Sequence, residues 1–413
     1  MEIKTIDEDD ANLYNICDAE IKLYLQLLLP YNSLTAQACA VEYFRRLLIR
    51  NHVPPLHIAD SLGGLEALVE CAALTDGETR DQVFWTLGNI ALDCPICHEK
   101  VQNSTALPLM IGVLVNPMFI CSKWTRNLVW ALSQIFRGGI HTLHHMFIQA
   151  TLTGLRPVLY MDDSKTRVDA VWTIAYIADD NVDGRQIDAV LQTPHLLERL
   201  IELLDESDTM RAALRALGNL VAGGDDQTQA VLNAGLLPRM MKLFRFNMPV
   251  YQKREIAWIL SNIAAGSRRQ IDLLFETNNI VETLIDTFYC DDYRIRKEVG
   301  WTVTNALTGA SISRSRWLCG SNVISLIPQL LHLHTERDLI DRTLYAIELL
   351  ITKRINFIFV LENYHIFQTI RQIVYNQNNQ FDALIKARAR RILNKENDYK
   401  AHQIPPGTYI LVR

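Results

Sequence analysis

Apolar residues recur three and four positions apart along most of this chain, which is the spacing of one buried face of an α-helix. Two segments show this spacing clearly, Pro194–Leu204 and Ala234–Phe244. In the second segment, Gly235 and Pro238 mark the start of the helix. The pattern predicts helices throughout the chain and no β-sheet.

One helical segment occurs six times. Each copy carries a Trp, or once an Arg, followed four residues later by Asn or a substitute for it. The leading residues are Trp85, Trp130, Trp172, Arg215, Trp258 and Trp301. They lie 42 to 45 residues apart, a period typical of HEAT and armadillo repeats. Because no such unit buries its apolar face alone, we expect the repeats to stack into an all-α superhelical solenoid.

The repeats are expected to form one continuous array over residues 13–396. Outside it, residues 1–12 are predicted to be a flexible acidic N-terminus and residues 397–413 a polar C-terminal tail. The less regular opening and closing helices are expected at Ile21–Ile49, Pro54–Val69, Ser325–His332, Asp338–Ile351 and Phe381–Leu393.

Glycines follow several of the repeat helices. They are Gly223, Gly224, Gly266 and Gly309. A glycine just past a helix often forms a left-handed C-terminal cap, so a positive φ is predicted at these positions.

The composition is that of a soluble globular protein, with 49% hydrophobic and 21% charged residues. A net charge of -5 gives no electrostatic footprint for nucleic acid and favours basic partners. The longest apolar stretch, Ala106–Cys121, is interrupted by Asn116–Pro117 and is too short to span a membrane. The N-terminus also lacks the features of a secretory signal. The 8 cysteines show no framework spacing, which predicts reduced thiols in a cytosolic or nuclear protein.

Residues i and i+4 share one helix face, so stacked repeats would align each leading residue and its partner into a ladder. The partners are Asn89, Gln134, Tyr176, Asn219, Asn262 and Asn305. Asp169, Glu255 and Glu298 each precede a Trp by three residues and belong to the same face. Asp93 and Asp225 add further negative charge near the ladder.

Two interpretations of this ladder are open. In the structural one, each Trp is a core residue and each Asn caps a neighbouring loop. In the other, the Asn amides hold the backbone of an extended peptide, since an amide both donates and accepts hydrogen bonds. Indole faces would then form slots for Lys and Arg stems, and the acidic residues would meet the cationic heads. Asn is unfavourable in the middle of a helix, which favours a groove for a Lys/Arg-rich segment.

The repeat sequences resemble the importin-α (karyopherin-α) family, armadillo-repeat receptors for nuclear localisation signals. The matching segments are WTLGN at Trp85–Asn89, RNLVW at Arg126–Trp130, ALRALGN at Ala213–Asn219, DDQTQ at Asp225–Gln229, WILSNIAAG at Trp258–Gly266 and RKEVGWTVTN at Arg296–Asn305. The resemblance covers about residues 40–350. It implies an adaptor without enzymatic activity that binds basic signal peptides of cargo proteins and is found in the cytoplasm and nucleus. It also implies recycling by a nuclear export factor.

The resemblance implies two peptide sites on one concave surface. The minor site falls on Arg215, Asn219, Asp225, Thr228, Glu255, Trp258, Asn262, Glu298, Trp301 and Asn305. The major site falls on Trp85, Asn89, Asp93, Trp130, Asp169, Trp172 and Tyr176, with Gln134 in an Asn position.

Three departures from the family pattern matter. The family opens with a basic segment that binds importin-β, whereas this chain opens with the acidic Asp7–Asp10, so engagement of importin-β by that route is left open. By the family pattern one repeat is missing near the start, either the family's second or its third, because Gly64 precedes Trp85 by only 21 residues. Gln134 replaces an Asn, and Leu92 replaces the glycine before Asp93. We therefore expect a weakened major site and a dominant minor site.

Other motifs give weaker signals. Cys94, Cys97 and His98 spell the C-x-x-C-H string of haem attachment, but no second cysteine pair has zinc spacing. Loop cysteines are the favoured interpretation, and no metal or cofactor is predicted. The basic run Lys386–Arg391 and the histidines at 141–145 and 332–334 are interpreted as surface residues. No catalytic motif is found in the sequence, so the main alternative is an armadillo scaffold for other protein partners.

Overall fold

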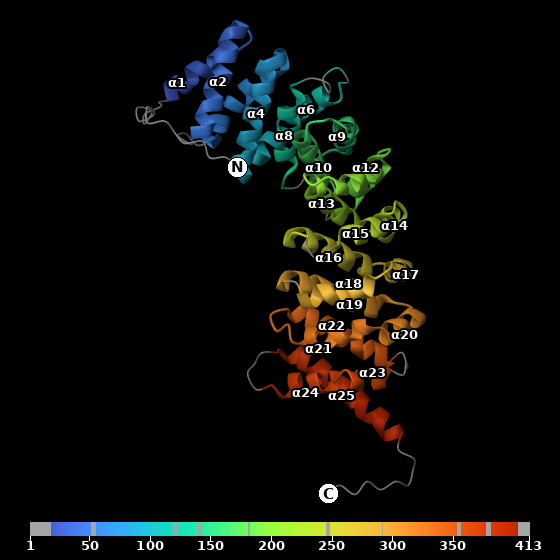
Figure 1. Ribbon diagram of the computed structural model, residues 1–413. Coiled ribbons are helices and arrows are strands. Elements are labelled where there is room, and N and C mark those ends of the chain that lie inside the picture. Colours follow the sequence, from blue (N-terminus) through green and yellow to red (C-terminus); the bar gives the residue numbers. More distant parts are fainter. Residues whose placement is uncertain are drawn as a thin grey trace. The chain divides into compact units, whose positions relative to one another are not determined.

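The computed structural model describes residues 18–403, apart from 51–54, 117, 119–122, 139–142, 181, 245–247, 291, 353–356 and 377–380. Throughout these residues the regular elements are helices, which confirms the all-α prediction. The chain divides into an amino-terminal unit, Met1–Asn219, and a carboxyl-terminal unit, Leu220–Arg413. Figure 1 labels the helices along both units. No described helix is both long and apolar enough to cross a lipid bilayer.

The amino-terminal unit contains pairs and triplets of short helices. They are α1 (Asp18–Leu27), α2 (Leu34–Arg50), η2 (His57–Ser61), α3 (Gly64–Leu74), α4 (Gly77–Asp93), α5 (Pro95–Asn103), α6 (Ala106–Leu114), α8 (Thr125–Phe136), α9 (His145–Val158), α10 (Ser164–Ile177), α11 (Arg185–Gln192), α12 (Leu196–Glu202) and η3 (Leu203–Asp205). Helix α13 (Met210–Val221) begins here and crosses the boundary.

The carboxyl-terminal unit repeats the same arrangement. Its helices are α14 (Asp225–Asn233), α15 (Leu236–Leu243), α16 (Val250–Ala265), α17 (Arg268–Glu276), α18 (Ile280–Cys290), α19 (Tyr293–Gly309), α20 (Ile312–Gly320), η4 (Asn322–Leu326), α21 (Ile327–Leu331), α22 (Arg337–Thr352), α23 (Phe357–Asn363), α24 (Ile366–Tyr375) and α25 (Ala383–Gln403).

The helices that carry the ladder pack side by side within each unit. In the first unit, α2 contacts α4, α4 contacts α8, and α8 contacts α10. In the second, the order is α16, α19, α22 and α25. Their apolar faces are buried against the other helices of the repeats, as shown by Phe84, Leu87 and Phe136, which are fully buried. Stacking of neighbouring repeats therefore supplies the core that one repeat lacks.

Glycine allows the closest approaches between ladder helices. A Cβ on Gly88 of α4 would lie 2.7 Å from Trp130 Cζ3 and 3.0 Å from Ala131 Cα of α8. A Cβ on Gly300 of α19 would lie 2.7 Å from Leu330 and 2.9 Å from Leu339. Gly88 is required by packing, because the Trp130 ring and the Ala131 backbone leave no space for a Cβ, whereas at Gly300 the ends of two leucine side chains would have to shift.

The predicted left-handed caps at Gly223, Gly224, Gly266 and Gly309 are wrong. None of these glycines has a positive φ. Gly224 (φ −71°) and Gly266 (φ −79°) lie in short extended connections that lead directly into the next helix. At Gly266, an added Cβ would lie 2.1 Å from Gln270 Oε1, which accepts a hydrogen bond from the Ser267 amide in a capping box. The glycine therefore makes room for the cap of the following helix.

The ends of the array differ from the predicted boundaries. The segment Ile21–Ile49 is two helices, because the chain turns between α1 and α2, where Asn32 Nδ2 donates to the Gln26 carbonyl and Ser33 Oγ accepts from the Ala36 amide. At the other end, α25 continues to Gln403, beyond the expected start of the tail at 397. The predicted acidic N-terminus at 1–12 lies outside the described residues, as do residues 404–413 of the predicted tail.

Candidate functional site

All five ladder tryptophans are half-buried. Trp85, Trp130, Trp172, Trp258 and Trp301 each expose part of the indole, whereas the flanking apolar residues of their helices are buried. These tryptophans are therefore not fully enclosed in the core. A half-buried indole on a helix face presents apolar surface to a ligand.

The first two tryptophans contact each other. The rings of Trp85 and Trp130 stack with centroids 6.1 Å apart and planes inclined by 22°. An aliphatic stem between two rings needs a carbon contact of about 3.5–4 Å on each side, roughly 7–8 Å in all. The expected slot between these two indoles is therefore closed. Gly88 permits this closure, because Trp130 lies directly against it.

Asp169 is a desolvated carboxylate beside Trp172. Both residues lie on α10, three positions apart, and Asp169 forms no ion pair with a residue that the structure describes. Burial raises the pKa of Asp169 to about 6, and the positive charge of Arg126 offsets only part of this. Such a carboxylate would be stabilised by a cation brought in by a ligand.

Aromatic faces near Asp169 already attract cations. The rings of Trp172 and Tyr176 stack 5.7 Å apart along α10. The guanidinium of Arg211 lies 5.8 Å from the Trp172 ring centroid, and Arg45 lies at the same distance from Trp85. These distances fall within the cation–π range of about 6 Å. The ladder indoles thus have the surroundings expected for binding arginine or lysine.

The ladder amides are used in part by the protein itself. Asn89 Nδ2 donates to the carbonyl of Trp85, four residues earlier on α4. Asn219 Nδ2 donates across to the Ala175 carbonyl of α10, at 2.9 Å. Gln134 Nε2 donates to Ser133 Oγ on its own helix. The partners are helix groups, so these amides do not cap loops as the structural interpretation expected. Each amide group still has a second N–H and a carbonyl oxygen.

The carboxyl-terminal unit has an acidic pair on adjacent ladder helices. Glu255 of α16 is 6% exposed and lies 3.5 Å from Arg254. A carboxylate oxygen of Glu298 of α19 lies 3.4 Å from Ser261 Oγ, and Glu298 forms no ion pair within the described part of the chain. Burial raises the pKa of Glu298, although Ser261 and nearby cations oppose this. Glu298 is therefore the counterpart of Asp169 in this unit.

The Ser261 backbone links the same two helices. The Ser261 carbonyl accepts a hydrogen bond of 3.2 Å from Asn305 Nδ2, and its hydroxyl donates to the Trp258 carbonyl. Trp258, Asn262, Trp301 and Asn305 are all half-buried. The structure therefore brings these ladder residues together on α16 and α19.

The remaining predicted residues have different surroundings. Thr228 is buried and donates to the Val221 carbonyl, which is a structural contact. Asp225 is exposed in the first turn of α14, and Arg215 is half-buried on α13. Asp93 is exposed at the end of α4. It lies next to two cysteines, Cys94 and Cys97, which belong to the start of α5 rather than to a loop.

Two ladder residues were missed by the sequence analysis. An open cleft of about 600 Å³ lies next to Trp301 and Asn305, and it is completed by residues of α22 and α25. Its other lining residues are Asp338, Asp341, Arg342, Tyr345 and Arg388. Tyr345 follows Trp301 by 44 positions and Arg388 follows Tyr345 by 43. The repeat period alone would have identified both, although neither is Trp or Asn.

The basic run of α25 is only in part a solvated face. Arg388 Nε donates to Asp341 Oδ1 at 2.7 Å, and its guanidinium lies 5.2 Å from the Tyr345 ring centroid. Arg391 pairs with Glu348 of α22 at 3.2 Å. The interpretation of this run as surface residues is therefore wrong for Arg388, which is held between α22 and α25.

Comparisons with known proteins agree with this architecture. Residues 224–265 match the model of the armadillo/beta-catenin-like repeat. Importin subunit alpha-1a of Oryza sativa subsp. japonica is 29% identical over 221 residues, which cover 53% of this chain and 41% of the relative. Importin subunit alpha-5 of Arabidopsis thaliana is 31% identical over 261 residues, which cover 63% of this chain and 49% of the relative.

Solved structures agree on the fold. The crystal structure of an engineered protein matches with a TM-score of 0.75 at 20% identity, covering 92% of this chain and 89% of that one. The chain spans less than half the length of the two importin subunits described above. It is thus an all-α armadillo-repeat protein that is similar, over part of its length, to importin alpha subunits.

Proposed function

We propose that this chain is a nuclear import adaptor that binds Lys/Arg-rich segments of cargo proteins in extended form. The observation that carries this proposal is the pairing of a half-buried Trp with a desolvated carboxylate three residues earlier, at Asp169–Trp172 and at Glu298–Trp301. In each pair, the carboxylate lacks an ion-pair partner in the described structure. The Trp301 indole offers a cation–π surface, whereas at Trp172 a ligand cation would share the ring with Arg211.

A single Lys or Arg side chain can contact both the indole and the carboxylate of such a pair. Its methylene stem covers the exposed indole, and its charged head reaches the carboxylate beside it. A cation beside a desolvated carboxylate stabilises the ionised form, which water does not stabilise there. The ligand therefore gains more binding free energy here than at a solvated surface. The ladder amides then offer hydrogen bonds to the peptide backbone, which fixes an extended conformation without reading sequence.

The carboxyl-terminal unit is proposed as the stronger site. There, Trp258 and Trp301 lie on adjacent helices, Glu298 is desolvated, and the cleft of about 600 Å³ remains open beside Trp301. In the amino-terminal unit, the stacked pair of Trp85 and Trp130 leaves no room for a side chain between the rings. A peptide there would have to separate the two indoles first.

The similarity to importin alpha subunits supports a role in transport between cytoplasm and nucleus. By the same similarity we propose a nuclear export factor as a recycling partner. Engagement of importin-β stays an open question, because residues 7–10 lie outside the described structure.

The proposal is tested by fluorescence anisotropy with a labelled Lys-rich signal peptide. The wild type should bind with a micromolar or lower Kd. The double variant Trp258→Ala/Trp301→Ala should lose roughly tenfold or more in affinity, because each cation–π contact is worth about 0.5–2 kcal/mol. Trp85→Ala/Trp130→Ala should lose less. The matched control is Trp317→Ala, which removes an exposed indole outside the ladder on α20.

A second labelled peptide, with every Lys replaced by Gln, distinguishes recognition of positive charge from nonspecific binding. It should not bind. Absence of binding by the wild type to the Lys-rich peptide would refute the receptor proposal. The closed Trp85–Trp130 stack and the internally bonded amides would then favour the alternative, an armadillo scaffold for other protein partners.

A further inference from the structure

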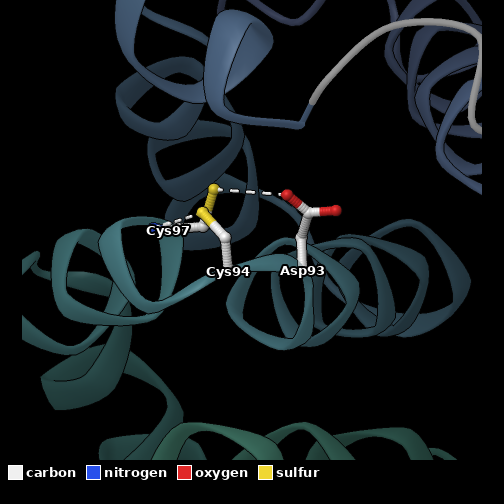
Figure 2. A group of neighbouring side chains, drawn as sticks. All are labelled: Asp93, Cys94 and Cys97. Atoms are coloured by element: carbon white, nitrogen blue, oxygen red, sulfur yellow. Dashed lines mark hydrogen bonds between the residues drawn. The ribbon is translucent and has the colours of Figure 1, made fainter.

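Two thiols and a carboxylate meet where α4 ends and α5 begins. The ligand atoms of Asp93, Cys94 and Cys97 all lie within 4.8 Å of one another. Figure 2 shows the two sulfur atoms side by side, with a carboxylate oxygen of Asp93 facing them. Cys97 is buried, Cys94 is half-buried and Asp93 is exposed, so the cluster has one open side.

The spacing of these atoms is close to that of a tetrahedral metal site. With metal–sulfur bonds of about 2.3 Å and metal–oxygen bonds of about 2.1 Å, the ligand atoms lie roughly 3.6–3.8 Å apart. Cys97 Sγ lies 3.8 Å from Asp93 Oδ2. Because no two of the ligand atoms are more than 4.8 Å apart, shifts of about 1 Å would bring all three ligands to one ion.

The start of α5 fixes the position of Cys94. This residue is the N-cap of α5, and its sulfur accepts a hydrogen bond of 3.3 Å from the Cys97 amide. Pro95 at the first helical position fixes the turn that returns Cys97 toward Cys94.

Cys97 is the buried member of the cluster, and its thiol donates toward Asp93 Oδ2 at 3.8 Å. A divalent cation bound among the three ligands would take the place of that proton, because a metal-bound thiol is deprotonated.

We propose that Asp93, Cys94 and Cys97 form a binding site for a thiophilic divalent cation of the Zn²⁺ class, with a fourth position open to solvent. As each metal–sulfur bond forms, the thiol releases its proton to water, so apparent affinity rises with pH. The sequence analysis disfavoured zinc for lack of a second cysteine pair, whereas the structure places Asp93 as a third ligand. The site shares Asp93 with the predicted major peptide site, but its two thiols and its test do not depend on peptide binding.

Cobalt titration of the reduced, metal-stripped full chain tests the proposal. Co²⁺ should bind at one per chain and produce the charge-transfer band of cobalt–thiolate bonds with the visible bands of tetrahedral cobalt. Zn²⁺ should remove both. Cys94→Ser should weaken binding by roughly 10-fold or more and lose part of the charge-transfer intensity. Serine is also a good N-cap, so this variant keeps α5. Asp93→Asn should weaken binding without loss of the thiolate band.

Cys39→Ser is the matched control, since it removes an exposed thiol on α2 and should leave the titration unchanged. Thiol counting before and after the titration confirms that the cysteines stay reduced. The proposal is overturned if the reduced wild type shows no cobalt–thiolate band, or if Cys94→Ser shows the same band and affinity as the wild type. A Cys94–Cys97 disulfide that forms in place of metal binding would also overturn it.

Discussion

Replacing Asp169 by Asn should make the protein more stable at neutral pH while weakening its binding to basic peptides. Burial raises the pKa of Asp169 from its ordinary value of 3.8 to about 6. A displacement of about two pH units corresponds to about 3 kcal/mol of cost for the ionised form. The carboxylate keeps some contact with water, so we expect about 1–2 kcal/mol of this cost to be measured.

The pH dependence follows from the sign of the shift. Folding raises the pKa of this carboxyl group, so the folded protein binds the proton more tightly than the unfolded chain does. Relative to the protonated state, the folded protein therefore loses stability as pH rises from the unfolded pKa of 3.8 to the folded pKa of about 6. The advantage of Asp169→Asn over the wild type should therefore be full at pH 7.5 and smaller at pH 4.5. Urea unfolding followed by circular dichroism at the two pH values measures it.

Asp179→Asn provides the control, because Asp179 is an exposed residue just after the same helix. Its effect should stay within about 0.5 kcal/mol at both pH values. If Asp169→Asn is no more stable than the wild type at pH 7.5, or if its advantage is the same at pH 4.5, the carboxylate is not desolvated as the structure indicates. The electrostatic basis of the proposed site in this unit would then be refuted.

Two further substitutions, each with a control, test the packing of the ladder. Gly88→Ala should destabilise the protein by about 1–3 kcal/mol, because its Cβ would meet Trp130, whereas Gly112→Ala at an open, exposed helix position should stabilise it by up to about 1 kcal/mol. Equal effects in thermal unfolding would contradict the close approach. Arg388→Ala should cost about 1 kcal/mol, because it removes the ion pair with Asp341 and the packing of the Arg388 stem, whereas Glu348 keeps Arg391; Arg390→Ala, on the exposed side of α25, should cost less than about 0.5 kcal/mol. Urea unfolding that ranks the two arginines the other way would refute this assignment.

The repeat architecture could be predicted because it depends on a period rather than on particular contacts. The spacing of 42 to 45 residues between leading residues placed the ladder on α4, α8, α10, α13, α16 and α19 correctly. The same period extends to Tyr345 and Arg388, but the sequence analysis followed Trp and Asn and stopped at Asn305. A search for Trp and Asn therefore missed ladder positions that a search for the repeat spacing alone would have found.

Other properties of the site depend on distances that the sequence does not contain. Asp169 and Glu298 share the i−3 relation to a Trp with Glu255, yet Glu255 has an arginine within 3.5 Å and the other two have no ion-pair partner in the described structure. The closure of Trp85 on Trp130 depends on how near α8 comes to Gly88. The left-handed glycine caps failed for a similar reason: Gly224 is the N-cap of α14, and Gly266, the C-cap of α16, is extended because the N-cap of α17 follows at once.

The partial burial of Asp169 and Glu298 strengthens the binding expected for a basic ligand. A fully buried Asp169 or Glu298 would be out of a ligand's reach, and a fully exposed one would already be stabilised by water. At intermediate burial the carboxylate destabilises the free protein and remains accessible to an incoming ammonium or guanidinium group. The free energy lost on folding can then be recovered on binding, which links stability and affinity at the same residue. A substitution that improves the stability of such a ladder position should therefore weaken the complex, and the paired measurements on Asp169→Asn examine both sides of that link.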